Sequence, residues 1–232
     1  MATWLTLSVS RWVVVEQPCR LNYTLPMRRF PFYGIPTFEA FARLDSPAKV
    51  QDFLNTLPIN FEPNGETCRS PLEALHHGSA QCLEGAVLAT AALWYHGRPP
   101  LLLDLETASP DDSHVVALYK ERGRWGAVSK TNHAVLRFRD PVYRSVRELA
   151  LSYFHEYFLH DGRKTLLSFS KEPFDLLDFE DEWVIADYPV WGVHDGLVNA
   201  PHTAIAPKRV LKNLRPADVI EIKAGKLVEW ER

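Results

Sequence analysis

The sequence predicts an α+β protein in which helices pack against an antiparallel sheet. Three observations lead to this class: a helical segment within 79–97 that is apolar on nearly every side, two strand-like runs at 114–120 and 125–131 joined by a tight turn, and a helical pattern that follows them. A helix that is apolar on nearly every side is stable only when other elements enclose it. We therefore expect the helix within 79–97 at the centre of the fold.

The composition favours one folded unit and excludes several classes of protein. Hydrophobic residues make up 46% of the 232 residues, enough for a sizeable core. A formal net charge of −3 without basic runs disfavours a protein that binds nucleic acids through general electrostatics. No apolar run approaches the roughly 18 residues of a membrane span. We expect a cytoplasmic protein with no nucleic-acid or membrane partner.

The three cysteines, Cys19, Cys68 and Cys82, do not form C-x-x-C pairs. This number and spacing disfavour both a disulfide scaffold and a structural zinc site. No pattern in the chain calls for a metal or an organic cofactor, so we expect none.

Changes in composition divide the chain into three segments of a single compact unit. Residues 1–45 mix strand-like runs with proline and predict an N-terminal arm, whose first residues resemble a strand more than a signal peptide. Residues 46–170 predict the core. Residues 171–232 predict a β-rich C-terminal extension packed on the core, which ends in a hairpin over 219–230 with its turn at Ala224 and Gly225.

Capping signals predict the other helices of the core. Ser46 followed by Pro47 predicts the start of a helix that Pro58 ends. A second Ser-Pro pair at 70–71 begins a short helix that ends at Gly78.

The segment after the central helix predicts the sheet and a further helix. The expected strands cover 101–105, 114–120 and 125–131. Pro141, with Asp140 as N-cap, then predicts the start of a helix that continues to Gly162.

Cys82 is the leading candidate for a catalytic residue. At the first turn of the central helix, unpaired backbone N–H groups and the helix dipole both favour a thiolate. A cysteine nucleophile also needs a base, and a polar group that orients the base. His114 begins the second expected strand after this helix, so its ring can extend from the strand end toward the start of the helix. We expect these two side chains to form a pair.

Three stretches resemble a known superfamily. The sequence QCLEGA at 81–86 begins an alanine-rich helix, SHVVAL at 113–118 begins a strand, and WGAV at 125–128 lies on the hairpin partner. Together they resemble the transglutaminase-like branch of the papain-like cysteine enzymes, and they are also similar to the papain-like peptidases that mature secreted bacterial peptides. The resemblance covers about 46–157. It implies a papain-like core whose central helix carries the cysteine, with the site residues in the order cysteine, histidine, polar orienter.

The orienting residue departs from the family pattern. Transglutaminase-like enzymes usually carry an aspartate about four positions after the hairpin tryptophan, and this chain has Ser129 there. Asn132 could orient the ring of His114 through its carbonyl oxygen, as asparagine does in the papain-like group, and is favoured narrowly over Ser129. Asp140 is a third candidate. Gln81 could contribute to an oxyanion site beside the Cys82 backbone N–H.

The expected function is cysteine-dependent acyl transfer or hydrolysis at an amide or peptide bond of a peptide or protein substrate. In this hypothesis Cys82 attacks the carbonyl and His114 accepts and returns the proton. Water as acceptor gives a hydrolase, a peptidase or amidase, and an amine gives an acyltransferase. The alternative is a catalytically inactive scaffold of the same fold that binds a peptide or protein partner.

Overall fold

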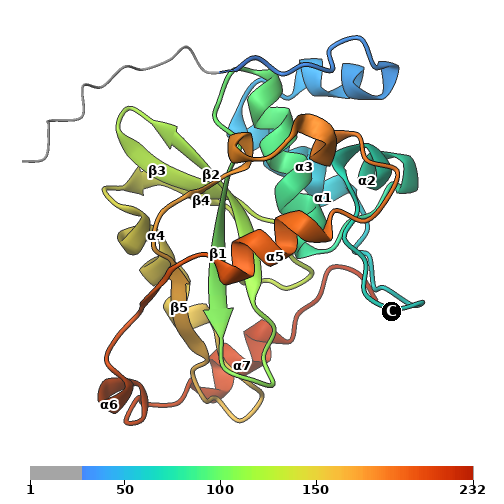
Figure 1. The fold of residues 1–232 in the computed structure, drawn as a ribbon. Coiled ribbons are helices and arrows are strands. Elements are labelled where there is room, and N and C mark those ends of the chain that lie inside the picture. Colours follow the sequence, from blue (N-terminus) through green and yellow to red (C-terminus); the bar gives the residue numbers. More distant parts are fainter. Residues whose placement is uncertain (1–27, 232) are drawn as a thin grey trace, which may run out of the picture.

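A computed structural model describes residues 28–231, which form helices on both faces of an antiparallel sheet (Figure 1). The strands are β1 (Leu101–Thr107), β2 (His114–Glu121), β3 (Arg124–Val128), β4 (Arg139–Tyr143), β5 (Leu166–Ser170), β6 (Phe174–Asp175) and β7 (His202–Ala204). Their order is β4-β3-β2-β1-β5-β7, with β6 paired to β1. The expected α+β class is confirmed. Cys19 and the strand predicted near the N-terminus lie outside the described residues.

The helices are short, apart from the central one. They are α1 (Pro47–Thr56), α2 (Pro71–His77), α3 (Cys82–Tyr95), α4 (Val146–Tyr153), α5 (Trp191–Asn199), α6 (Lys208–Leu211) and α7 (Val219–Gly225). The 3-10 helices are η1 (Pro36–Arg43), η2 (Phe154–Glu156), η3 (Leu176–Asp178) and η4 (Asp181–Val184). Within residues 28–231, none of the helices has the length and apolar character needed to cross a membrane.

Helix α3 is the centre of the fold, as predicted. Every residue from Leu83 to Trp94 is buried, and the helix packs against β1 and β2. Gly85 is required there, because a Cβ at this position would overlap the side chain of Lys130. The small residues of the helix therefore allow the chain after β3 to approach closely.

The sheet separates two hydrophobic clusters. Side chains alternate along β1, so Leu102 packs with α3 on one face, whereas Leu103 and Leu105 pack with α4 on the other. Phe30, from the N-terminal arm, contacts Trp94 at the C-terminal end of α3, far along the helix from Cys82. The described part of the arm thus covers the end of α3 opposite the cysteine.

The capping predictions for α1 and α2 are confirmed. The Ser46 hydroxyl accepts from Lys49 N–H, and the Ser70 hydroxyl accepts from Glu73 N–H. Gly78 ends α2 in the left-handed conformation, with φ of 63°. These local signals fix helix ends because each one satisfies backbone groups that the helix itself leaves unpaired.

The prediction of a helix from Pro141 is wrong. Pro141 lies within β4, which is at the edge of the sheet and, among the described strands, pairs only with β3. An edge strand tolerates proline, because no further strand needs a hydrogen bond from its missing N–H. The helix begins later, and Ser145 is its N-cap through a hydrogen bond from Glu148 N–H. Asp140 is therefore a strand residue and not an N-cap.

The predicted C-terminal hairpin is also wrong. Residues Val219–Gly225 form α7, whose start is stabilised by Glu221 accepting from Asp218 N–H. The valine and isoleucine residues favour a strand, but the capping signal at the helix start prevails. The described part of the C-terminal extension contains more helix than strand, since its two strands, β6 and β7, have only two and three residues.

Candidate active site

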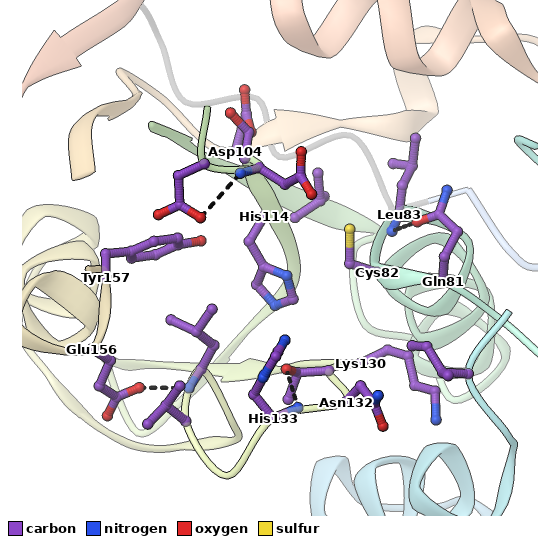
Figure 2. A pocket seen from close by; sticks show the side chains of 18 of the residues that line it. Gln81, Cys82, Leu83, Asp104, His114, Lys130, Asn132, His133, Glu156 and Tyr157 are labelled. Carbon is purple, nitrogen blue, oxygen red and sulfur yellow. Dashed lines mark hydrogen bonds between the residues drawn. The ribbon is translucent and has the colours of Figure 1, made fainter. Parts of the chain in front are cut away.

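Cys82 and His114 line the same cavity, which has a volume of about 850 Å³. Cys82 is the first residue of α3, and His114 is the first residue of β2. Figure 2 shows their side chains at neighbouring positions on the wall of this cavity. The structure thus brings together the two residues that the sequence selects as nucleophile and base.

The hydrogen bonds of His114 define which ring nitrogen carries the proton. The ring is 6% exposed, and its Nε2 lies 2.8 Å from the Ser129 hydroxyl oxygen. The single proton of that hydroxyl is donated to the carbonyl oxygen of Leu136. The Ser129 oxygen must therefore accept from Nε2–H, which leaves the Nδ1 lone pair of the neutral ring available as a base.

Helix α1 holds Ser129 in place. Ser129 N–H donates to Gln51 Oε1 at 2.9 Å, and Gln51 Nε2 donates to the Ser129 carbonyl oxygen at 2.8 Å. Gln51 was not among the residues predicted for the site. Its only sequence signal is a polar residue beside the apolar positions Val50 and Leu54 of α1.

The Asn132 side chain is hydrogen-bonded to Trp230 and not to His114. Its Nδ2 donates to the Trp230 carbonyl oxygen at 2.9 Å, and its Oδ1 accepts from Trp230 N–H at 2.8 Å. Strand β3 ends at Val128, and the chain then turns toward the C-terminal segment, so strand alternation no longer governs this residue. Asp140 lies on β4, so of the three candidates only Ser129 bonds the ring.

Burial sets the protonation of the pair. It raises the pKa of the Cys82 thiol to about 11, although the backbone N–H groups of Val115 and Leu83 stabilise the thiolate. Burial also lowers the pKa of His114 to about 4, assisted by the charge of His133. Near neutral pH the site is therefore a neutral thiol beside a neutral imidazole. The expectation that the helix start lowers the thiol pKa is wrong. Desolvation raises this pKa by more than the backbone N–H groups at the helix start lower it.

Gln81 is the N-cap of α3. Its Oε1 accepts from Leu83 N–H at 2.6 Å, and its Nε2 donates to the Thr67 carbonyl oxygen at 3.1 Å. The side-chain amide is thus engaged at both ends. The Cys82 N–H belongs to the first turn of the helix, where no intrahelical carbonyl is available to it.

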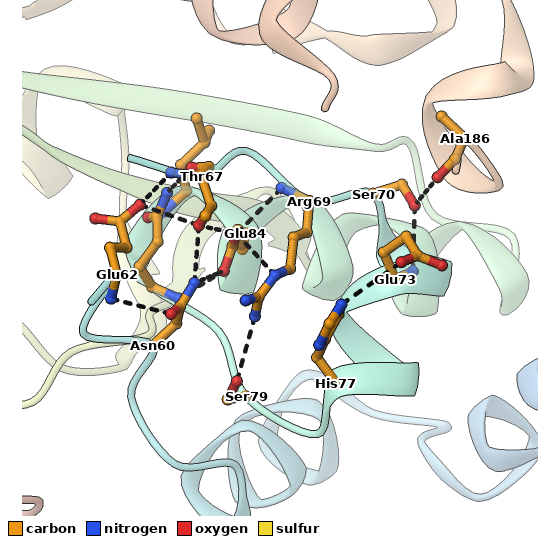
Figure 3. Close-up of polar contacts among 12 residues, drawn as sticks. Asn60, Glu62, Thr67, Arg69, Ser70, Glu73, His77, Ser79, Glu84 and Ala186 are labelled. Atoms are coloured by element: carbon orange, nitrogen blue, oxygen red, sulfur yellow. Dashed lines mark hydrogen bonds and ion pairs between the residues drawn. The ribbon is translucent and has the colours of Figure 1, made fainter. Parts of the chain in front are cut away.

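A polar cluster around Glu84 fixes the loop beside the cysteine (Figure 3). Glu84 is 1% exposed, and its carboxylate accepts hydrogen bonds from Asn60 Nδ2, Thr67 Oγ1, Arg69 N–H and Gln81 N–H. The bond from Gln81 N–H is one half of a capping box at the start of α3. The other three attach residues 60–69 to the start of α3, and the sequence contains no local signal for them.

Carboxylates are the commonest charged groups on the cavity wall. The carboxylates that line it belong to Glu62, Glu66, Asp104, Asp111, Asp112 and Glu156. Lys130 also lines the cavity, but its Nζ donates to the carbonyl oxygens of Leu54 and Leu57 near the end of α1, and burial lowers its pKa to about 8. Among residues 28–231, no three histidine, cysteine or carboxylate side chains are grouped as metal ligands.

The fold and the site define an α+β protein with a cysteine–histidine pair in a cavity. No protein-family model matches the chain, and no curated protein matches it. Among solved structures it is similar to two of Legionella pneumophila LapG, one of them EGTA-treated, at 18% identity and a TM-score of 0.32. The matches cover 40% of this chain and 57% and 59% of the LapG chains, less than two thirds of their length.

Proposed function

We propose that this chain is a cysteine-dependent acyl-transfer enzyme of the transglutaminase-like, papain-like type, with Cys82 as nucleophile, His114 as base and Ser129 as orienting residue. The observation that supports it is the hydrogen bond from His114 Nε2–H to Ser129, which leaves Nδ1 unprotonated in the cavity that Cys82 shares. This is the tautomer that a base for a thiol requires.

The chemistry follows from the neutral state of the pair. As the Cys82 sulfur forms a bond to the carbonyl carbon of the substrate, the thiol proton moves to His114 Nδ1. The imidazolium then donates this proton to the leaving nitrogen, the C–N bond breaks, and a thioester remains on Cys82. Because both groups begin uncharged, proton transfer accompanies the attack instead of preceding it.

Water or an amine completes the reaction. The acceptor loses a proton to His114 Nδ1 while it attacks the thioester, the C–S bond breaks, and the proton returns to the sulfur. Ser129 accepts from Nε2–H throughout. A neutral hydroxyl stabilises the transient imidazolium less than a carboxylate does, so the proton is held on His114 only briefly.

An active-ester experiment tests the proposal. The wild-type protein is mixed with p-nitrophenyl acetate, the burst of p-nitrophenolate is recorded, and the acetylated residue is located by peptide mass spectrometry. We expect acetylation of Cys82 in the wild type and none at residue 82 in Cys82→Ala. Cys68→Ser is the matched control, because burial raises the pKa of this 1% exposed thiol to about 12 and it does not line the cavity.

A wild-type protein that gives no acetylated Cys82 contradicts the proposal. It would favour the alternative function, a scaffold that binds a peptide or protein partner without chemistry. If Cys82 is acetylated, mass spectrometry of a peptide mixture, with and without an added primary amine, distinguishes a hydrolase from an acyltransferase.

A further inference from the structure

The Tyr157 hydroxyl is a buried polar group that the mechanism above does not use. Tyr157 is 2% exposed and lines the same cavity as Cys82 and His114. Its hydroxyl has no hydrogen-bond partner among residues 28–231. A buried hydroxyl without a partner is unfavourable, and such groups in native proteins call for an explanation.

The position of the ring is well defined. Tyr157 directly follows η2, and its carbonyl oxygen accepts from Thr165 N–H at 3.2 Å. The ring belongs to the hydrophobic cluster on the α4 face of the sheet. In Figure 2 the hydroxyl points from this side of the cavity toward His114, which lies between Tyr157 and the start of α3.

The hydroxyl remains protonated. Burial raises the pKa of Tyr157 well above its ordinary value, and the carboxylates of Asp111 and Asp104 raise it further. Tyr157 therefore presents a neutral O–H group that can both donate and accept a hydrogen bond across the neutral pH range.

We propose that the Tyr157 hydroxyl is a further catalytic group, which hydrogen-bonds the substrate atom that exchanges its proton with His114. This inference rests on the proposed function. The atom is the leaving nitrogen during acylation and the oxygen of the attacking water during deacylation. The hydroxyl lies on the His114 side of the cavity, whereas an oxyanion would lie against the Cys82 N–H at the start of α3.

Tyr157 stays neutral throughout the proposed reaction. In deacylation the water gives one proton to His114 Nδ1 while its other O–H donates to the Tyr157 oxygen, which directs the water lone pair at the thioester carbon. The C–O bond forms, the C–S bond breaks, and His114 returns its proton to the sulfur. Tyr157 keeps its own proton, so its contribution is to place the water.

The variant Tyr157→Phe tests this role of the hydroxyl through three reaction rates at Cys82: alkylation, acylation and deacylation. Alkylation by iodoacetamide releases iodide and involves no proton donor for the leaving group, so we expect its rate within about twofold of wild type. The burst with p-nitrophenyl acetate releases a stable phenolate and should stay within about threefold. The steady-state rate, which reports deacylation by water, should fall about 10- to 100-fold.

A rescue experiment distinguishes water placement from a structural effect. Hydroxylamine is a strong nucleophile that depends little on a placed water, so it should restore most of the deacylation rate of Tyr157→Phe. The melting temperature of the variant should equal or exceed that of wild type, since the removed hydroxyl has no protein partner.

Tyr153→Phe is the matched control. Tyr153 is the last residue of α4 and is fully buried, but its hydroxyl donates to the Arg137 carbonyl oxygen at 3.1 Å. We expect this variant to melt at a lower temperature and to deacylate at the wild-type rate. A deacylation loss equal to that of Tyr157→Phe would overturn the inference.

The other outcomes are equally decisive. An unchanged steady-state rate in Tyr157→Phe overturns the inference while the proposed function stands. An equal loss in burst and steady state also overturns it, because that pattern indicates an oxyanion contact common to both steps. A wild-type protein without a burst overturns the proposed function and, with it, the inference.

Discussion

Glu84 and Tyr157 are both buried, at 1% and 2% exposure, but their hydrogen bonding is opposite. The Glu84 carboxylate accepts from four donors, whereas the Tyr157 hydroxyl has no partner among the described residues. A group whose hydrogen bonds are complete stabilises the fold. A group whose hydrogen bonds are incomplete is available to a ligand, at a cost in stability.

The same contrast exists within one side chain. His114 Nε2 is paired with Ser129, while no hydrogen bond to Nδ1 is found among residues 28–231. In the proposed function, the paired nitrogen positions the ring and the unpaired nitrogen is the base. The comparison predicts that substitutions at complete groups change stability, and that substitutions at incomplete groups change rates.

The largest effect is expected from His114→Ala. Loss of the base should slow the burst with p-nitrophenyl acetate about 10²- to 10⁴-fold, measured by stopped-flow absorbance. The control is His133→Ala, since His133 also lines the cavity but its Nδ1 is paired with the Gly225 carbonyl oxygen at 3.1 Å. Equal losses in the two variants would contradict the assignment of His114, rather than another histidine of the cavity, as the base.

Glu84→Ala should destabilise the protein by about 3–5 kcal/mol, measured by urea unfolding, because several buried donors and Arg69 lose their acceptor. Glu73→Ala is the control. Glu73 is a partly exposed carboxylate on α2 that contacts His76 and His77, and its loss should cost less than about 1 kcal/mol. Similar values for the two variants would contradict the structural role of the Glu84 cluster.

The stability of the protein should fall in acid because of His114. Its pKa is about 4 in the folded state against an ordinary 6.5, so the unfolded chain binds more protons between these pH values. The contribution of this group is present above pH 6.5 and lost as the pH falls to about 4, a loss of about 3 kcal/mol. Urea unfolding across this range measures it, and His114→Gln should lack this part of the decline.

The smallest effect is expected from the orienting residue. Ser129→Ala leaves Nε2–H without its acceptor, and we expect the burst rate to fall about tenfold. Asn132→Ala removes only contacts to the Trp230 backbone, so its burst should stay within about threefold of wild type. A larger loss in Asn132→Ala than in Ser129→Ala would assign the orienting role to the asparagine.

Much of the fold was predictable where the signal is local. Ser46 and Ser70 specify helix starts because the hydroxyl and the N–H it accepts from are three residues apart. The predictions failed at Pro141 and over 219–230, where strand and helix signals compete within a few residues. There the outcome depends on which neighbour the segment packs against, and sequence patterns do not contain that neighbour.

The sequence by itself determined the α+β class and the enclosed helix that begins at Cys82, because apolar periodicity and helix-end chemistry are properties of adjacent residues. It offered His114 as a candidate partner of that cysteine. The tertiary structure alone decided that Ser129 bonds the ring, that burial keeps the thiol and imidazole neutral, and that the Tyr157 hydroxyl is left unpaired. Each of these depends on desolvation and on contacts between distant segments, which exist only after the chain has folded.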